Sequence, residues 1–504
     1  MRVGLICGLL ALVLYVLTCA PGVEWQDSGV HQYRIVTGQA ENSRGLALSH
    51  PLHYWLGRGL LRIPLGEPAY RLNLLSAVCG AVGVGLLAAL LTRLVRRQQA
   101  VLFAAGALLV AHSYWQMSAL TETYTIAGAL MVLEWWLLLA YVTRGQPLWL
   151  VALFGVNGLH VADHPLGLLT GVTYVVLLLE RVVRGKLPAQ WLLAAAVAWL
   201  IGASPYLALA AGYYQRTGDL AMTIRSALFG GGETGGYAQE VLAVRVGTAQ
   251  LALAGLTLGY NFPSLAVPLA VVGITRRPRR RNRTFRRVLL AQTLIVAGFV
   301  LRYPIPDLYT FFVPVCLLVA LWLGLGIDWF LRRTPMGRAR PWRTAVLVVS
   351  TLLPVAVYVV FPAVARERQW LRARLRNLPH RDEYAAFFKP WRHGDDSAAR
   401  FARETLELVG PYGWVLADHT TAPALAYTYM FHGGPPGVRV YCGRISFTPP
   451  DALVLEPEDA EEYVRAGGRV LAVAGCASEH AWGRHLNMDK SDQYNWFVLP
   501  SPEP

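Results

Sequence analysis

Charged residues are scarce in this chain of 504 residues: 15% are Asp, Glu, Lys or Arg, whereas 55% are hydrophobic. Because soluble proteins carry roughly 25% charged residues, the composition excludes an ordinary soluble protein. It indicates an integral membrane protein with room for a helical bundle and a further domain. The net charge of +15 would suggest a nucleic-acid partner in a soluble protein. Here the basic residues form short clusters between apolar runs, which is typical of membrane topology signals, and no nucleic acid is expected.

Motifs for bound cofactors are also lacking. The six cysteines show no Cys-x-x-Cys pair and no metal-ligand spacing. The stretch "GGGETGG", residues 230–236, lacks the Lys-Ser/Thr pair and the preceding strand of a phosphate-binding P-loop, so we interpret it as a mobile outer loop. No internal repeat is visible.

Long apolar runs are what the sequence has instead. A bilayer-spanning helix needs about 17 to 25 residues, and about eleven runs qualify, although the run at 147–161 is short and the boundary near 115–122 is weak. The predicted spans are 3–20, 72–92, 99–115, 122–142, 147–161, 165–182, 190–210, 248–274, 288–303, 308–331 and 343–362.

Arginine and lysine clusters predict the orientation of these spans. They follow the second, fourth, sixth, eighth and tenth runs, and the longest is "RRPRRRNRTFRR" at 276–287. All fall on one side if the N-terminus is cytoplasmic, and such clusters mark the cytoplasmic face. We therefore predict a multi-pass protein of the cell membrane with its C-terminus outside. Cleavage of the first span as a signal peptide is the less favoured alternative.

Two segments outside the spans are long enough to fold. The first outer loop, 21–71, contains the amphipathic stretches "DSGVHQYRIVTG" and "HPLHYWLGRGLLRI", which predict helices at the membrane interface. The tail, 363–504, alternates short apolar segments with helical patterns, which predicts an extracytoplasmic α/β domain with a mostly parallel sheet. The predicted strands are 413–418, 438–442, 451–456, 469–475 and 495–500, with helices near 421–431 and 457–466. Cys442 and Cys476 each end a predicted strand and are a candidate disulfide.

Acids and histidines gather at the outer ends of the predicted spans. A charge at the bilayer centre costs roughly 2.5–3.5 kcal/mol, and this chain avoids that cost. If the segment after the first span is helical, Glu24, Asp27 and His31 share one face. The candidate substrate-binding residues on the outer side are Glu24, His31, His50, His53, Glu122, His160, His164, Arg225 and Arg302. Each alone is readily explained as a solvated or structural residue, and only their convergence suggests a site.

The pattern suits the transfer of a sugar from a lipid phosphate. Phosphate is a good leaving group, so the acceptor hydroxyl needs a base and the departing phosphate needs a cation. Asp27 is the candidate base, and Arg225, Arg302 and His164 are candidates for the phosphate. A divalent metal is possible at His160, Asp163 and His164, since two histidines four apart on a helix can bind one. Loop histidines beside a proline are commoner without a metal, and no cofactor is certain.

Several motifs resemble a known family. The stretches "EWQDSG" (24–29), "HPLHYWLGR" (50–58), "RLNLLSAVCGA" (71–81), "TETYTIAGAL" (121–130) and "GLHVADH" (158–164) are similar to bacterial relatives of the transmembrane protein O-mannosyltransferases, which are C-type glycosyltransferases. The resemblance covers roughly residues 10–180. It implies a C-type bundle over 1–362 and an outer domain over 363–504. It also implies inverting sugar transfer from a polyprenyl-phosphate donor, with Asp27 as the base.

The resemblance has departures. The family usually has a Glu directly after Asp-Ser-Gly, where this chain has Val30, and "HPPGYPLY" where it has "HPLHYWLG". The first departure leaves the acceptor open, whether protein, glycan or lipid. A lipid or solute transporter is the alternative function, although transporters usually bind near the bilayer midplane within repeats. A scaffold without activity is a third possibility, but it would not need Asp27 beside histidines.

Overall fold

The computed structural model describes residues 1–64, 66–231, 236–275, 283–305, 307–333, 340–371, 376–442, 445–447, 455–473, 487–490 and 495–499. Several predictions lie outside these ranges. They are Cys476 and its disulfide, most of the strand expected at 451–456, most of the basic run at 276–287, and most of the glycine-rich stretch at 230–236.

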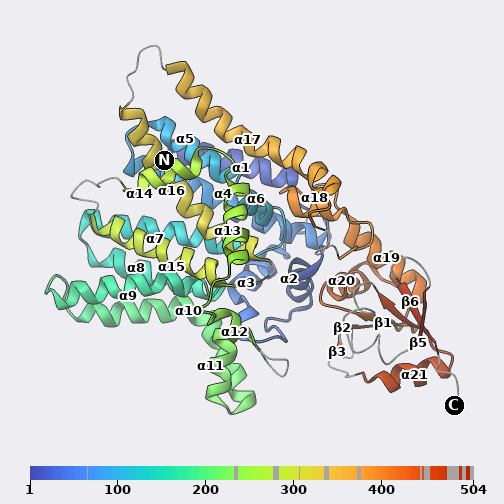
Figure 1. Ribbon diagram of the computed structural model, residues 1–504. Coiled ribbons are helices and arrows are strands. Elements are labelled where there is room, and N and C mark those ends of the chain that lie inside the picture. Colours follow the sequence, from blue (N-terminus) through green and yellow to red (C-terminus); the bar gives the residue numbers. More distant parts are fainter. Residues whose placement is uncertain are drawn as a thin grey trace.

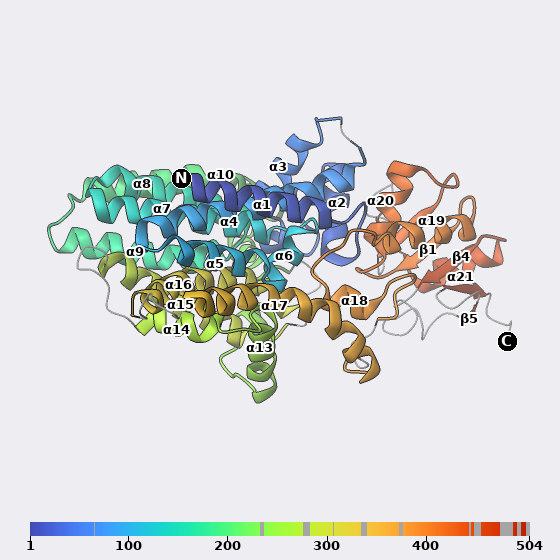
Figure 2. The same ribbon diagram turned by 90° about the horizontal axis from the view of Figure 1, so that it is seen from above.

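Residues 2–367 form mainly a bundle of helices (Figure 1). Its members are α1 (Arg2–Thr18), α4 (Pro68–Leu94), α5 (Gln98–Leu109), α6 (His112–Ser118), α7 (Tyr124–Arg144), α8 (Pro147–Asp163), α9 (Gly167–Val183), α10 (Gln190–Thr217), α13 (Thr248–Asn261), α14 (Ala266–Thr275), α15 (Arg283–Arg302), α16 (Phe312–Arg333) and α17 (Arg340–Glu367). Figure 2 shows most of them lying alongside one another, with the C-terminal sheet beyond one end of the bundle. Multiple apolar helices make this a multi-pass membrane protein.

Eleven separate spans are not supported. Within the described ranges, six helices are long and apolar enough to cross a membrane, or eight if each bent pair counts as one span. The run at 99–115 bends by 64° between α5 and α6, and the run at 248–274 bends by 103° between α13 and α14. Three further runs give helices of only 17 residues, α1, α8 and α9. Apolar length in the sequence therefore overstates straight helix length, because it does not register the breaks.

Small residues bring α1 close to α4. A Cβ placed on Gly4 would lie 2.7 Å from the Gly85 carbonyl oxygen, and one on Gly8 would lie 3.4 Å from Gly85 Cα. In a bilayer, helices associate through such close backbone packing because lipid tails provide little hydrophobic driving force. A larger side chain at Gly4 would separate the two helices.

Two helices lie in the first outer loop where the amphipathic stretches predicted them, α2 (Gln26–Thr37) and α3 (Pro51–Leu60). The short helix η1 (Leu46–Leu48) separates them, and α11 (Leu220–Phe229) and α12 (Ala238–Val241) lie between α10 and α13. A further short helix, η3 (Leu308–Phe311), precedes α16. These short elements, together with the ends of α7, α9 and α15, surround the candidate site.

The C-terminal part contains a six-stranded sheet in the order β3-β2-β1-β4-β6-β5. Its strands are β1 (Trp414–Ala417), β2 (Arg439–Cys442), β3 (Ile445–Ser446), β4 (Val470–Val473), β5 (Asn487–Lys490) and β6 (Asn495–Leu499). The helices α18 (Glu383–Phe388), α19 (Ser397–Val409), α20 (Ala422–His432) and α21 (Pro457–Arg465) accompany them.

This sheet is mixed rather than mostly parallel. Among the residues that the structure describes there, the β1–β2 and β1–β4 pairings are parallel, and the β2–β3, β4–β6 and β5–β6 pairings are antiparallel. Two helix crossovers produce the parallel centre, whereas β5 and β6 pair as an antiparallel hairpin without one. The predicted boundary at 362 falls inside α17, which continues to Glu367, so the division into two domains stays a prediction.

Helix α2 is held between the bundle and the sheet. The Trp25 indole donates a hydrogen bond of 2.9 Å to Ser397 Oγ, and the Gln26 amide donates one of 3.2 Å to the Thr420 carbonyl. The Tyr33 hydroxyl donates to the Phe447 carbonyl. On the bundle side, the Gln32 amide nitrogen lies 2.9 Å from Asn73 Oδ1 on α4. Groups far apart in the sequence thus fix the position of this helix.

Candidate active site

Asp27 stands in the first turn of α2 and is exposed. Its side chain is 60% exposed, and its Oδ1 is 3.1 Å from Arg44 Nη2. Trp25, just before the helix, is 4% exposed and packs on Phe401 with ring centroids 5.2 Å apart. The buried indole thus anchors the start of α2 and presents Asp27 to the space in front of it.

The sequence predicted that Glu24 and Asp27 share one face of a helix, but in the structure they do not. The helix begins only at Gln26, whose φ of +57° turns the chain just before it. Glu24 is 7% exposed. Burial and the nearby Asp395 raise the pKa of its carboxyl to about 8, so it is mostly protonated at neutral pH. Glu24 is therefore not a second negative charge beside the candidate base.

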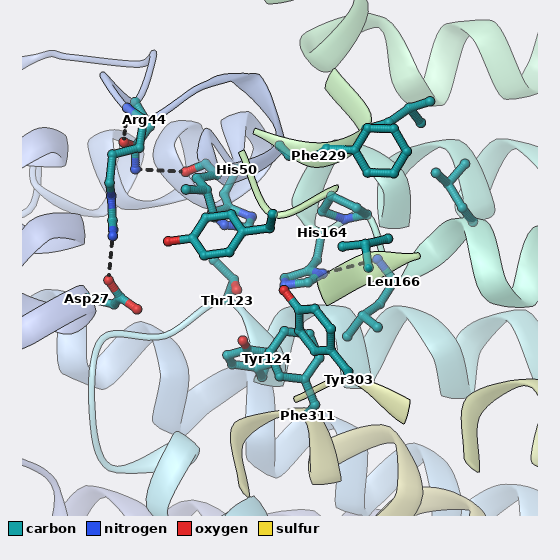
Figure 3. A pocket seen from close by; sticks show the side chains of 18 of the residues that line it. Asp27, Arg44, His50, Thr123, Tyr124, His164, Leu166, Phe229, Tyr303 and Phe311 are labelled. Carbon is teal, nitrogen blue, oxygen red and sulfur yellow. Dashed lines mark hydrogen bonds and ion pairs between the residues drawn. The ribbon is translucent and has the colours of Figure 1, made fainter. Parts of the chain in front are cut away.

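Two cavities meet at Asp27 and Arg44, and Figure 3 shows side chains that line the first of them. One, of about 270 Å³, is mainly apolar and extends between α2, α9, α11 and α15, past Leu166, Phe229 and Phe311. The other, of about 290 Å³, is more polar and extends toward the C-terminal part of the chain. Asp27, Arg44 and Glu122 line both. We call them the apolar cavity and the polar cavity.

Glu122 also lines both cavities, in the turn before α7. Its Oε1 accepts a hydrogen bond of 2.9 Å from the Ser28 hydroxyl, and its side chain is buried. Burial raises the pKa of this carboxyl to about 8, and the negative charges of Asp27 and Asp307 act in the same direction. Glu122 is therefore a neutral acid at pH 7, able to donate a hydrogen bond into the cavity.

Four buried histidines form a cluster behind Asp27, built from His31 on α2, His50 and His53 at the start of α3, and His164 after α8. His31 lies 5.5 Å from His50 and 5.1 Å from His53 between ring centroids, and His50 stacks on His164 at 5.0 Å. His50 Nδ1 donates to the Asp163 carbonyl at 2.7 Å. Burial lowers the pKa of His50 to about 4 and that of His53 to about 3, so the cluster is neutral at pH 7.

The three residues of the possible metal site are not assembled. The His160 ring points into the bundle, where its Nδ1 lies 2.9 Å from Glu134 Oε1, which also accepts from Asn157 at 3.0 Å. His164 Nδ1 instead accepts from the Leu166 amide. In the part of the chain that the structure describes, no group of three or more His, Cys, Asp or Glu is placed to hold a metal ion.

The structure brings neither Arg225 nor Arg302 to the cavities. Arg225 lies exposed on α11. The Arg302 guanidinium donates to the carbonyls of Val241 and Ala243, the latter at 3.0 Å, and so supports the segment after α12. Neither residue lines the apolar or the polar cavity. Both predictions rested on membrane depth alone, which does not report side-chain direction.

Arg44 is the cation that the sequence analysis missed. It lines both cavities and pairs with Asp27. Its backbone is fixed, because its amide donates to Asn42 Oδ1 at 2.9 Å and its carbonyl accepts from the Gly231 amide at 2.7 Å. A signal was present: Arg44 is the only basic residue between the two amphipathic stretches of the first loop.

Comparisons with known proteins agree with the resemblance in the sequence. Residues 49–186 match the family described as "Protein O-mannosyl-transferase TMEM260 N-terminal domain". This segment contains His50, Glu122 and His164 but begins after Asp27. No curated protein matches the chain.

Solved structures share the fold. ArnT from Cupriavidus metallidurans superposes with a TM-score of 0.61 in the apo state and 0.60 bound to undecaprenyl phosphate, at 18% and 15% identity. Both matches cover 99% of this chain, and 99% and 98% of ArnT. Arabinofuranosyltransferase AftD from Mycobacteria matches with a TM-score of 0.52 and 11% identity, over all of this chain and 42% of AftD. The fold is thus that of C-type glycosyltransferases, and together with the family match it supports a glycosyltransferase.

Proposed function

We propose that this membrane glycosyltransferase transfers a sugar from a polyprenyl-phosphate donor to an acceptor hydroxyl, with inversion and with Asp27 as general base. One observation carries the proposal: an exposed carboxylate and a guanidinium, Asp27 and Arg44, are paired where an apolar cavity meets a polar one. A lipid-linked sugar needs both environments, since its chain is apolar and its sugar is polar. The undecaprenyl phosphate bound by ArnT, which shares the fold, adds support.

The geometry suggests a sequence of bond changes. The lipid of the donor lies toward the apolar cavity, and its phosphate lies beside Arg44. Asp27 takes the proton of the acceptor hydroxyl as that oxygen bonds to the anomeric carbon from the side opposite the phosphate. The bond between the anomeric carbon and the phosphate oxygen breaks, and the released polyprenyl phosphate keeps the electron pair. Arg44 stabilises its negative charge, while Asp27 retains the proton.

Sugar transfer by the purified protein tests this proposal. In detergent or nanodiscs, the protein should consume polyprenyl-phosphate mannose or another polyprenyl-phosphate sugar and release polyprenyl phosphate. A glycan comparison between cells with and without the gene identifies the acceptor. The alternative, a lipid transporter, predicts movement of the intact donor between leaflets without cleavage of the sugar–phosphate bond. Cleavage that is absent with every donor, together with such movement, would reverse the choice.

The raised pKa of Glu122 predicts that activity falls at alkaline pH. The pKa of about 8 means that the carboxyl loses its proton as pH rises through that value, which places a second negative charge beside Asp27 and removes a hydrogen-bond donor. We expect kcat/KM of the wild type to fall above about pH 8. Gln in place of Glu122 is neutral at every pH and can still accept from Ser28, so Glu122→Gln should stay active at pH 7 and lose that alkaline fall. Identical pH profiles of the two proteins would contradict this role.

The predicted topology, with a cytoplasmic N-terminus and an outer C-terminus, can be tested with reporter fusions at two positions. A reporter fused after residue 285 should be cytoplasmic, because the neighbouring arginines mark the inner face. One fused after residue 400 should be outside, together with the sheet and the polar cavity. A cytoplasmic signal from the fusion at 400 would place the proposed acceptor site inside the cell and overturn an outer-face reaction.

A further inference from the structure

The polar cavity has a wall of arginines supplied by the C-terminal part of the chain. Arg376, Arg381 and Arg392 all line this cavity, and none lines the apolar cavity. Arg392 is 6% exposed, and the side chain of Arg381 is 16% exposed. Buried guanidinium groups are costly to maintain unless they are paired and fully hydrogen-bonded. If the side chains of these arginines had a full set of hydrogen-bond and ion-pair partners within the protein, a purely structural role would explain them.

The side chains of Arg381 and Arg392 differ in how fully they are hydrogen-bonded. The Arg392 guanidinium donates to the Ala386 carbonyl, and the backbone amide of Arg392 donates to the Thr18 carbonyl at 2.7 Å. Arg381 Nε is buried and has no hydrogen-bond partner among the described residues. Its nearest ion-pair partner there, Glu383 Oε2, is 4.0 Å away, which is beyond hydrogen-bond distance.

Acidic residues lie near both guanidinium groups. Asp395 and Glu24 face Arg392, together with the Tyr309 hydroxyl. Asp395 already accepts a hydrogen bond of 2.6 Å from the Ser397 hydroxyl. Glu24 is mostly protonated at neutral pH, because its pKa is about 8. The two guanidinium groups thus stand close together in a cavity that reaches Asp27, and Arg381 Nε has no hydrogen-bond partner among the described residues although Glu383 lies nearby.

We propose that Arg381 and Arg392 bind an anionic group of the acceptor, a phosphate or a carboxylate, so that the protein glycosylates an acidic acceptor. The inference rests on the proposed function, since it places the acceptor hydroxyl between these arginines and Asp27. Arginine binds such oxyanions through two parallel hydrogen bonds. The donor phosphate has a separate position beside Arg44, where the apolar cavity takes the lipid. The arginine pair lies outside that cavity, so an anion bound there belongs to the second substrate.

Binding of inorganic phosphate to the full-length protein tests the inference without knowledge of the acceptor. We would titrate phosphate, and acetate as a carboxylate probe, by calorimetry in the presence of saturating undecaprenyl phosphate. Wild type should bind at least one of the two anions, and Arg381→Ala should raise its Kd by about tenfold or more, as expected for loss of a charged hydrogen bond. Arg400→Ala is the matched control, because Arg400 lies on α19, pairs with Glu404 at 2.9 Å and lines neither cavity.

Each outcome decides the question. Wild-type affinity in Arg381→Ala would overturn the proposal, and so would the absence of anion binding to wild type. Loss of anion binding when undecaprenyl phosphate is present would assign the arginines to the donor. If Arg381→Ala does not purify as a folded protein, Arg381→Gln, of similar length and uncharged, replaces it. Anion binding without sugar transfer would refute only the proposed function, and transfer without anion binding would refute only this inference.

Discussion

Asp27→Asn should lose about 10²- to 10⁴-fold in kcat, the range that a positioned general base contributes. The substitution keeps the size of the side chain and a hydrogen bond with Arg44, but the amide cannot take the acceptor proton. Because the side chain is 60% exposed, its replacement should change the free energy of unfolding by no more than about half a kcal/mol. The loss would be measured as release of polyprenyl phosphate by purified protein, with thermal unfolding recorded in parallel.

Asp219→Asn is the matched control for this experiment. Asp219 caps α11 by accepting from the Met222 amide at 2.9 Å, and it lines neither cavity. Since Asn caps helices as well as Asp does, this variant should keep wild-type activity. Glu24→Gln should also have a small effect, because the buried carboxyl is already mostly protonated. A rate for Asp27→Asn equal to wild type would end the catalytic assignment.

Arg44→Ala should lower kcat/KM by about 10- to 100-fold, as expected when one charged hydrogen bond to the leaving phosphate is removed. Arg44→Lys keeps the charge without the planar fork and should recover part of the loss. Steady-state kinetics of wild type and both variants with a polyprenyl-phosphate sugar as donor would measure the loss and its recovery.

Unlike Arg44→Ala, the variants Arg302→Ala and Arg225→Ala should have little effect on binding of the donor phosphate. Arg225 is exposed on α11, so its loss should leave donor use unchanged. Arg302 supports the carbonyls of Val241 and Ala243, so its loss should reduce stability more than phosphate binding. A larger loss of donor affinity in Arg302→Ala than in Arg44→Ala would restore the sequence-based assignment and refute the one from geometry.

Local patterns in the sequence predicted several local features of the structure. Amphipathic spacing located α2 and α3, because a helix at an interface needs one apolar face. The short polar stretch after the first span located Asp27, because acids are rare so close to a bilayer. The strand patterns at 413–418 and 438–442 overlap β1 and β2 for a similar reason, as central strands are short and continuously apolar.

Features that depend on distant contacts could not be predicted in this way. The cavity wall formed by Arg381 and Arg392 faces Asp27 only because of how the C-terminal segment packs. The direction of the His160 side chain, which turns toward Glu134 on α7, is a further such feature. Breaks within apolar runs, as between α13 and α14, leave little trace in hydropathy because the residues on both sides remain apolar.

The anchoring of α2 has a consequence for the order in which the protein is made. Trp25 and Ser397 are separated by 372 positions, and Tyr33 and Phe447 by 414. A ribosome therefore synthesises α2 near the start of translation and the residues that support it near the end. During that interval, which lasts tens of seconds or more at about 5–20 residues per second, the nascent chain holds Asp27 without the wall that completes the polar cavity. If Asp27 is the base that we propose, activity should begin only with a finished polypeptide, and prematurely terminated chains should be inactive even when their bundle is inserted.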